Sequence, residues 1–421
     1  MDYRVIAGLF LLLFLGLADN QTIPALLPEL SGSLGVGVAT TGLLVVFYSL
    51  AAALAAFLTG SLSDVYGRRR FLLGGAWFFL VGSLASSFSR SFAELAVARS
   101  VTGLAAGALS TCSTAYAGDW FDYTVRGRAL GLISSAYFVA PLGVPLAALI
   151  ADRYGWPRVF TAFAALAVVV ALAAQTLPHE RNPEGRYARS EPRLEGDPQP
   201  AGGSPDVLRR TLSTFASLIA RRDTAAMLVI AFLVSGGLVS FLTYIGTWLH
   251  SSFGLSTTGI GLVFMLGGLV AVGAAPLGGV FADRWGKRSV SIASNVLLFG
   301  TMAVLPFFGW GVGLLIAFIG VSLGIGFRQG PITALMTEMV PRQRRGSFVA
   351  LRNIASQVGI GAAVFSGGLL YEWHGYTAVT TLSALMAGLV ALLLTTHIAE
   401  PETVRHEAAS ALSSANHDQA G

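Results

Sequence analysis

Three charged side chains, Asp19, Arg99 and Arg328, lie inside long apolar stretches of the sequence. A charge at the centre of a bilayer costs about 2.5–3.5 kcal/mol even on insertion scales, so charges in such stretches mark functional sites. Burial of a carboxyl group favours its neutral form, which lets it take up and release a proton near neutral pH. Asp19 is therefore the candidate proton carrier, and Arg99 is a second candidate functional residue.

Each of these three charges also has a structural interpretation. Asp19 can bond to neighbouring helices or reach water, and Arg99 can fix the ends of helices. Three roles fit Arg328: binding an anionic substrate, pairing with Asp19, or holding Glu338. The sequence leaves these alternatives open.

Polar and aromatic side chains in the apolar stretches are candidates to line a substrate cavity. Most residues of this kind serve helix packing or the membrane interface, and a minority contact substrate. The candidates are Asn20, Gln21, Tyr116, Tyr137, Tyr244, Trp248, Arg328 and Gln329.

Membrane-spanning helices must hold these residues. The chain has 421 residues, of which 54% are hydrophobic and 12% charged, whereas a soluble domain carries about 25% charged residues. A bilayer core about 30 Å thick needs about 20 apolar residues per helix. Twelve such runs occur: Val5–Leu27, Thr40–Leu62, Phe71–Phe88, Phe92–Ala117, Ala129–Ile150, Val159–Leu177, Ala225–Trp248, Ile260–Phe281, Val290–Phe308, Val312–Met336, Phe348–Leu370 and Tyr376–His397.

The same composition excludes several classes of protein. The single cysteine, Cys112, leaves no disulfide within the chain. The net charge of +5 comes from short basic clusters between apolar runs, which does not make the continuous face that nucleic acid requires. The motifs of zinc proteases, serine hydrolases and nucleotide-binding loops are missing, as is a Cys/His metal set. We therefore expect no enzyme, no cofactor, no metal and no nucleic-acid partner.

The basic residues also predict an orientation. Loops after the second, fourth, eighth and tenth runs hold eleven Arg and Lys residues, whereas the opposite loops hold three. The positive-inside rule predicts that the loops richer in Arg and Lys and both termini lie on the cytoplasmic side of the cell (inner) membrane.

A loop motif occurs twice, with a glycine, an aspartate, a second glycine and two basic residues. Its residues are Gly60, Asp64, Gly67, Arg68 and Arg69 in the first half, and Gly279, Asp283, Gly286, Lys287 and Arg288 in the second. The offset is 219 residues (283 − 64). Other acidic residues pair at this offset or one residue more: Asp119 with Glu338, and Asp152 with Glu372.

These matches indicate a duplication of six spans, which predicts two pseudo-symmetric bundles with a ligand site between them near the membrane midplane. The Pro- and Arg-rich stretch between the halves predicts a solvated linker whose end, around Leu212 and Phe215, has the spacing of an interfacial helix. We therefore expect a bundle over 1–178, a linker over 179–222, a bundle over 223–400 and a disordered tail over 401–421.

The duplicated loop motif resembles the signature loop of the major facilitator superfamily. The string from Arg99 to Gly103 is similar to a motif of the same family that is tied to proton transfer, with Thr102 where the family usually has Gln. The run from Ala140 to Pro145 looks like the motif of its exporters, although Ala140 replaces the first glycine. The resemblance implies an all-α membrane protein with twelve helices in two bundles, most like the drug:proton antiporters.

The residues of the loop motif also predict a role in gating, and the alternative is that its charges only set the orientation of the chain in the membrane. Asp64 is expected to face the positive N-terminus of another helix. The arginines are expected to bridge to acidic groups and so to latch the outward-facing state. This gating motif adds Asp119, Asp122, Arg126 and Glu338 to the loop residues.

The sequence therefore predicts a secondary active transporter that works by alternating access. We expect a monomer that exchanges external protons for a small amphipathic compound. The alternative is a proton-coupled importer of an organic anion or a sugar.

Overall fold

A computed structural model describes residues 2–121, 123–178, 215–340 and 345–398 of the chain, and these residues form helices without any strand. The expected all-α fold class is confirmed. The first half contains α1 (Tyr3–Leu34), α2 (Val38–Tyr66), α3 (Arg68–Phe88), α4 (Phe92–Trp120), α5 (Tyr123–Ser134), α6 (Ala136–Val139), η1 (Ala140–Gly143), α7 (Val144–Tyr154) and α8 (Trp156–Gln175). The second contains α11 (Arg222–Phe253), α12 (Thr257–Trp285), α13 (Lys287–Val304), η2 (Leu305–Phe307), α14 (Val312–Glu338), α15 (Arg345–His374) and α16 (Tyr376–Thr396).

Among the described residues, eleven helices are long and apolar enough to cross a membrane. They correspond to eleven of the twelve predicted runs. The remaining run, 129–150, is not one continuous helix but is divided among α5, α6, η1 and α7. Pro141 and Pro145 explain the η1 turn between α6 and α7, because proline lacks an amide hydrogen and its ring clashes with the preceding turn.

The chain packs as two compact units. Unit 1 consists of Met1–Leu212, Leu242–Met265 and Ile360–Gly375, and unit 2 of Ser213–Phe241, Leu266–Gly359 and Tyr376–Gly421. Helices α11, α12 and α15 thus contribute residues to both units. This division differs from the bundles expected over 1–178 and 223–400, which stay a prediction.

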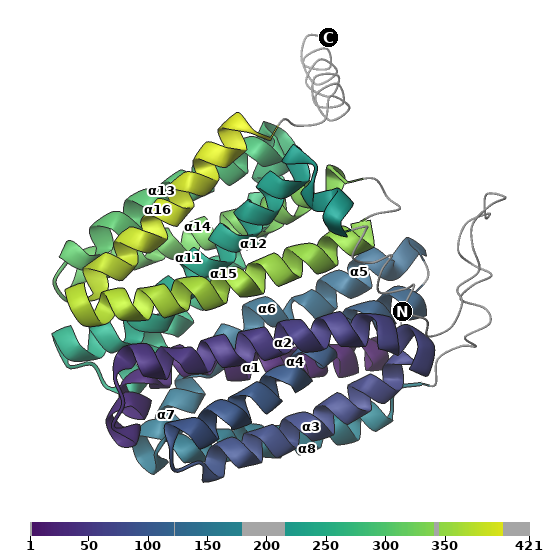
Figure 1. Ribbon diagram of the computed structural model, residues 1–421, viewed down its shortest axis with the longest axis horizontal. Helices are drawn as coiled ribbons and strands as arrows, with labels where there is room; N and C mark the ends of the chain where they lie inside the picture. Colours follow the sequence, from purple (N-terminus) through teal and green to yellow (C-terminus); the bar gives the residue numbers. More distant parts are fainter. Residues whose placement is uncertain (1, 122, 179–214, 341–344, 399–421) are drawn as a thin grey trace, which may run out of the picture. The chain divides into compact units, whose positions relative to one another are not determined.

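Within unit 1, α4 packs against α1, α2 and α3, and α3 also packs against α8 (Figure 1). Two glycines of α4 make the contact with α2 close: a Cβ atom at Gly103 would meet the backbone of Tyr48, and one at Gly107 the backbone of Ala52. Small residues four positions apart let helix backbones approach in this way. The glycines of α4 therefore serve helix packing.

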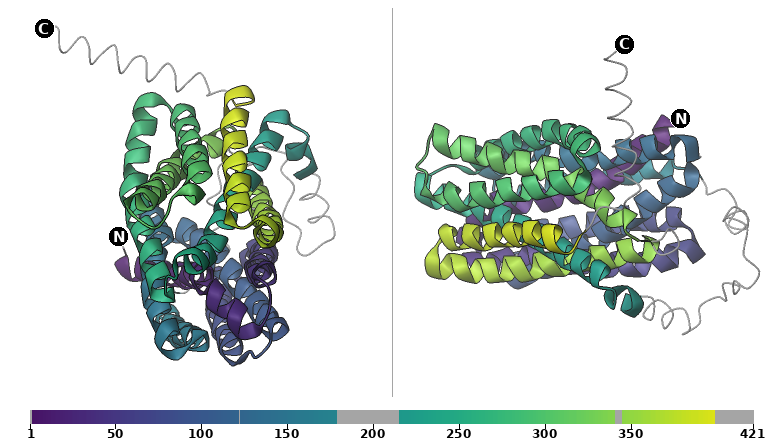
Figure 2. Two further views of the ribbon diagram at one scale, coloured as in Figure 1. Left: turned by 90° about the vertical axis from the view of Figure 1, so that its left-hand side faces the viewer. Right: turned by 90° about the horizontal axis from the view of Figure 1, so that it is seen from above.

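Within unit 2, α13 packs against α14 and α16, and the long helices lie side by side (Figure 1, Figure 2). Gly278 of α12 again permits a close approach, because a Cβ atom there would meet the backbone of Phe327 in α14.

The linker and the tail fall mainly outside the described residues. Of the interfacial helix expected near residues 208–219, Phe215 is buried and Ile219 is exposed, whereas Leu208 and Leu212 are not described. The tail over 401–421 also lies outside the described residues.

Candidate functional site

Asp19 of α1 and Arg99 of α4 form a buried ion pair in unit 1. The distance between Asp19 Oδ2 and Arg99 Nη1 is 2.7 Å, and neither side chain is exposed to solvent. The sequence identified both residues but considered pairing with Asp19 only for Arg328. The two proton-coupling candidates therefore make one site, and Arg99 is the cation at Asp19.

Aromatic rings enclose the guanidinium group. Its carbon lies 4.7 Å from the centre of the Tyr48 ring and 5.5 Å from that of Phe160, within the range of cation–π attraction. The hydroxyl group of Tyr48 donates a hydrogen bond to the carbonyl oxygen of Gly16 at 2.8 Å. Helices α1, α2, α4 and α8 thus build the surroundings of the pair.

The pair leaves part of its hydrogen-bonding capacity unused. Among the described residues, Asp19 Oδ1 and Arg99 Nε and Nη2 have no hydrogen-bond partner. A buried pair of this kind is weak evidence for stability, because the cost of removing two ions from water offsets their attraction. Chemically, Asp19 Oδ1 can accept a proton while Oδ2 still faces Arg99.

The next two polar residues of α1, Asn20 and Gln21, are partly exposed. Asn20 Oδ1 is buried and has no hydrogen-bond partner among the described residues. Side-chain atoms that can form further hydrogen bonds therefore extend along α1 from Asp19 to Asn20.

Of the aromatic cavity candidates, two donate a hydrogen bond to the backbone of a distant segment of the chain. The hydroxyl of Tyr116 donates to the carbonyl oxygen of Pro178, and that of Tyr244 to the carbonyl oxygen of Val364, each at 2.7 Å. Trp248 packs edge-on against Phe253, with ring centres 5.1 Å apart, and Tyr137 is exposed. Tyr116 and Tyr244 are thus placed by helix packing.

Arg328 of α14 is buried in unit 2. Its Nη1 donates to Asn295 Oδ1 at 3.2 Å and its Nη2 to the carbonyl oxygen of Val234 at a long 3.5 Å. Both described partners are neutral, and Arg328 Nε has no hydrogen-bond partner among the described residues. The neighbouring Gln329 is exposed. The side chain of Glu338, the third role considered for Arg328, is not described.

The gating motif is described in part. Arg68 Nε lies 3.1 Å from Asp119 Oδ2, and the role of this ion pair in gating stays a prediction. Gly67 and Gly286 have φ of 90° and 87°, a left-handed conformation that glycine adopts without steric cost. Gly60 and Gly279 have open space where a Cβ atom would lie, and Asp283 is exposed. The side chains of Asp64, Asp122 and Arg126 are not described.

The second basic residue of each loop has a role that the sequence analysis missed. Arg69 donates to the carbonyl oxygens of Leu177 and Gln175, both at 2.8 Å. Arg288 donates to those of Leu394 and Thr395 at 2.9 and 2.7 Å. Each arginine therefore caps the C-terminal end of a helix, α8 or α16, where carbonyl groups lack helical partners. The repeat itself carried the signal, because both loops have a basic residue at this position.

Comparison with known proteins places these features in a family. The model of the Major Facilitator Superfamily matches residues 9–363 and 247–416. The MFS-type transporter YwfA of Bacillus subtilis is 28% identical over 372 residues, which cover 87% of this chain and 85% of that protein. The multidrug resistance protein Stp of Mycobacterium tuberculosis is 26% identical over 406 residues, which cover 87% of this chain and 75% of that protein.

Two solved structures have the same fold. A D-xylose-proton symporter has a TM-score of 0.76 at 15% identity, with 94% of this chain and 98% of that one covered. The inward-open xylose transporter XylE from E. coli has a TM-score of 0.76 at 16% identity, with 95% and 97% covered.

Proposed function

The chain belongs to the Major Facilitator Superfamily of transporters, and we propose that it is a proton-coupled exporter of a small amphipathic compound. In this proposal it works by alternating access between the two sides of a cell membrane. The motif loops and both termini face the cytoplasm, as the distribution of basic residues favours. Protons and the exported compound are its small-molecule partners.

The observation that carries the proposal is the ion pair between Asp19 and Arg99. When Asp19 is ionised, the attraction to Arg99 holds α1 against α4 in a region that excludes water. A proton taken up at Asp19 Oδ1 removes that attraction and leaves Arg99 without a counter-charge, because arginine stays protonated in proteins. Proton uptake and release thus change what holds these two helices together, which is the physical requirement for coupling.

The driving force is sufficient for export. Moving one charge across about 100 mV supplies about 2.3 kcal/mol. At about 1.4 kcal/mol per tenfold change in concentration, this supports a gradient of about 40-fold.

Two observations favour export over import. The relative Stp is named a multidrug resistance protein. The interrupted span from α5 to α7 contains the prolines and glycine of the exporter-like motif. The alternative, a proton-coupled importer of an organic anion or a sugar, is favoured by the buried cation Arg328. The likeness to xylose transporters concerns the fold alone and does not favour a sugar.

The test has two steps. Overexpression and deletion strains are first screened against a panel of compounds to find one whose cellular level depends on the protein. That compound is then added to proteoliposomes that contain a trapped pH indicator, and proton movement is recorded. We expect counter-movement of protons and compound for the natural chain. Co-movement in the same direction would favour the importer.

Asp19→Asn tests the proton site in the same vesicles. We expect it to lose transport driven by a pH gradient but to keep exchange of labelled for unlabelled compound, because exchange requires no net proton movement. Gradient-driven transport at the natural rate in Asp19→Asn would refute the role of Asp19.

A further inference from the structure

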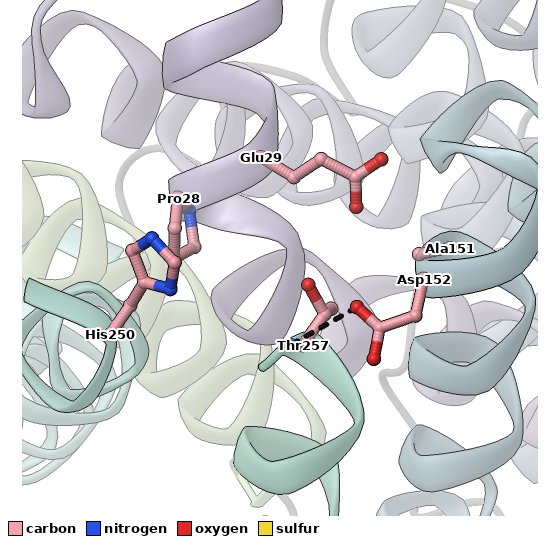
Figure 3. A pocket seen from close by; sticks show the side chains of 6 residues that line it. All are labelled: Pro28, Glu29, Ala151, Asp152, His250 and Thr257. Carbon is pink, nitrogen blue, oxygen red and sulfur yellow. Dashed lines mark hydrogen bonds between the residues drawn. The ribbon is translucent and has the colours of Figure 1, made fainter. Parts of the chain in front are cut away.

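Asp152 caps a helix of the other half of the sequence. It lies in the last turn of α7, beyond the apolar run 129–150, and its carboxylate accepts two backbone hydrogen bonds in unit 1. Oδ2 accepts from the amide of Thr258 at 2.7 Å, and Oδ1 accepts from that of Thr257 at 3.2 Å (Figure 3). These amides begin α12 and have no partner within that helix. A carboxylate there is also stabilised by the helix dipole.

Glu372 makes the corresponding contact in the opposite sense. It lies in the last turn of α15, and its Oε1 accepts from the amide of Ala39 at 3.1 Å, also within unit 1. Ala39 is the second residue of α2. The approach depends on a glycine, because a Cβ atom at Gly37 would collide with Glu372 Oε1.

These two contacts are equivalent, because they occupy corresponding positions in the two halves of the repeat. Asp152 and Glu372 are 220 residues apart (372 − 152), and Ala39 and Thr258 are 219 apart (258 − 39). In each case an acidic residue that ends one span caps the helix that begins a span of the other half. Both occur at connections on the side opposite the motif loops, where Gly155 and Gly375 follow the acidic helices with φ of 81° and 71°.

We propose that Asp152 and Glu372 are a symmetric pair of gate residues that hold this side of the transporter closed. This inference rests on the alternating-access part of the proposed function. Each carboxylate holds the start of a helix from the other half, so opening this side requires both caps to break. When this side opens, water forms hydrogen bonds with the carboxylates and the released amides. These bonds replace the lost caps, so the gate can open and close repeatedly.

The electrostatics of Asp152 suit a lasting cap. Burial raises the pKa of this carboxyl group, but the hydrogen bonds from Thr258 and Thr257 outweigh burial and hold the pKa below its ordinary value of 3.8. Asp152 therefore stays ionised at neutral pH and can act separately from the proton site at Asp19.

The structure supplies a matched control beside Asp152, in a pocket that both residues line. Glu29 of α1 lines this pocket with Asp152 and His250 (Figure 3), and its Oε1 accepts from the amide of Trp156 at 2.8 Å. Trp156 begins α8, so this carboxylate also caps a helix. Since α1 and α8 belong to the same half, this cap is not expected to break when the gate opens.

The experiment measures the gate by distance. Cys112 is replaced by alanine, spin labels are attached to cysteines at the exposed positions 33 and 252, and the distance distribution is recorded in nanodiscs by pulsed electron resonance. Substrate and proton gradient are both absent. The result therefore bears on the gate and not on whether the protein is an exporter.

We expect removal of one cap to shift the closed-to-open ratio by about 5-fold, the change that corresponds to the typical loss of stability on N-cap removal. We expect this shift for Asp152→Ala and for Glu372→Ala, and about 25-fold for the double variant if the caps are independent. Asp152→Asn should restore most of the closed population, because an amide oxygen still caps a helix. Glu29→Ala should match the natural chain.

Two results would overturn the proposal. One is a double variant whose distance distribution equals that of the natural chain. The other is a shift in Glu29→Ala as large as in Asp152→Ala, which would mean that loss of any cap loosens this region. Circular dichroism of each labelled variant verifies that its helices are intact.

Discussion

The ion pair between Asp19 and Arg99 predicts an unusual order of stability among its variants. Asp19→Leu leaves a buried guanidinium without its counter-charge, and arginine cannot neutralise itself by losing a proton. Arg99→Met leaves a carboxyl group, which can neutralise itself by taking up a proton. Asp19→Leu should therefore be the more destabilising of the two, although both remove the same ion pair.

The magnitude follows from complete burial of both side chains. Loss of one partner of a buried pair costs about 3–5 kcal/mol, whereas replacement of both by apolar residues of similar volume is often neutral or stabilising. The double variant Asp19→Leu/Arg99→Met should thus be more stable than Asp19→Leu alone. The coupling free energy between the two substitutions should be about 3 kcal/mol or more, because the residues are in direct contact.

The chain contains its own reporter for this measurement. Cys112 is the single cysteine of the chain and is buried in α4, so a fluorogenic maleimide reacts with it when the surrounding helices open. Apparent melting temperatures of the four proteins are compared in one detergent. A double variant that is destabilised by the sum of the two single effects would refute the reasoning, because the ion pair would then carry no coupling.

Two further predictions follow from the helix contacts. Gly107→Val should destabilise the protein by at least about 1–3 kcal/mol, because the valine side chain would clash with the backbone of α2 at Ala52. Gly74→Val is the control in the same maleimide assay, because a side chain there meets open space. The Asp152 cap should hold at neutral pH and weaken as the pH falls from about 3.8 towards its lowered pKa, because in this range the open state, in which the carboxyl group has lost its hydrogen bonds, takes up a proton first. The spin-label distances are recorded against pH in a chain that carries Glu29→Gln and His250→Gln, the other ionisable side chains that line the pocket. Opening near pH 6 in that background would contradict the prediction.

The sequence predicted the helices better than their contacts. Apolar runs of about 20 residues identify spans because a bilayer leaves backbone polar groups no partner outside a helix. The interruption at Pro141 and Pro145 was visible as an exporter-like motif, yet its division into α5, α6, η1 and α7 was not expected. Proline marks where a helix is strained, but the surrounding packing decides whether it bends or breaks.

The sequence also identified Asp19 and Arg99 without predicting that they pair. Their separation of 80 residues contains no information on how α1 and α4 face each other. Hydrophobic periodicity is weak in a helix that is apolar on all sides, so the facing sides cannot be assigned from it. The caps made by Arg69 and Arg288 were missed for a related reason, because their partners are backbone carbonyls, which no residue type identifies.

The duplication separates the contacts of this chain into two kinds. Contacts that occur in both halves, such as the caps of Arg69 and Arg288 or of Asp152 and Glu372, join helix ends. The buried charges do not repeat: positions 219 residues after Asp19 and Arg99 hold Leu238 and Phe318, and those 219 before Arg328 and Asn295 hold Leu109 and Ala76. A duplicated ancestor supplies two of each structural contact, whereas the proposed proton site in one half has no need of a second. Departure from the repeat is therefore the sequence signal that points to the proposed chemistry, and agreement with it points to the scaffold and the proposed gates.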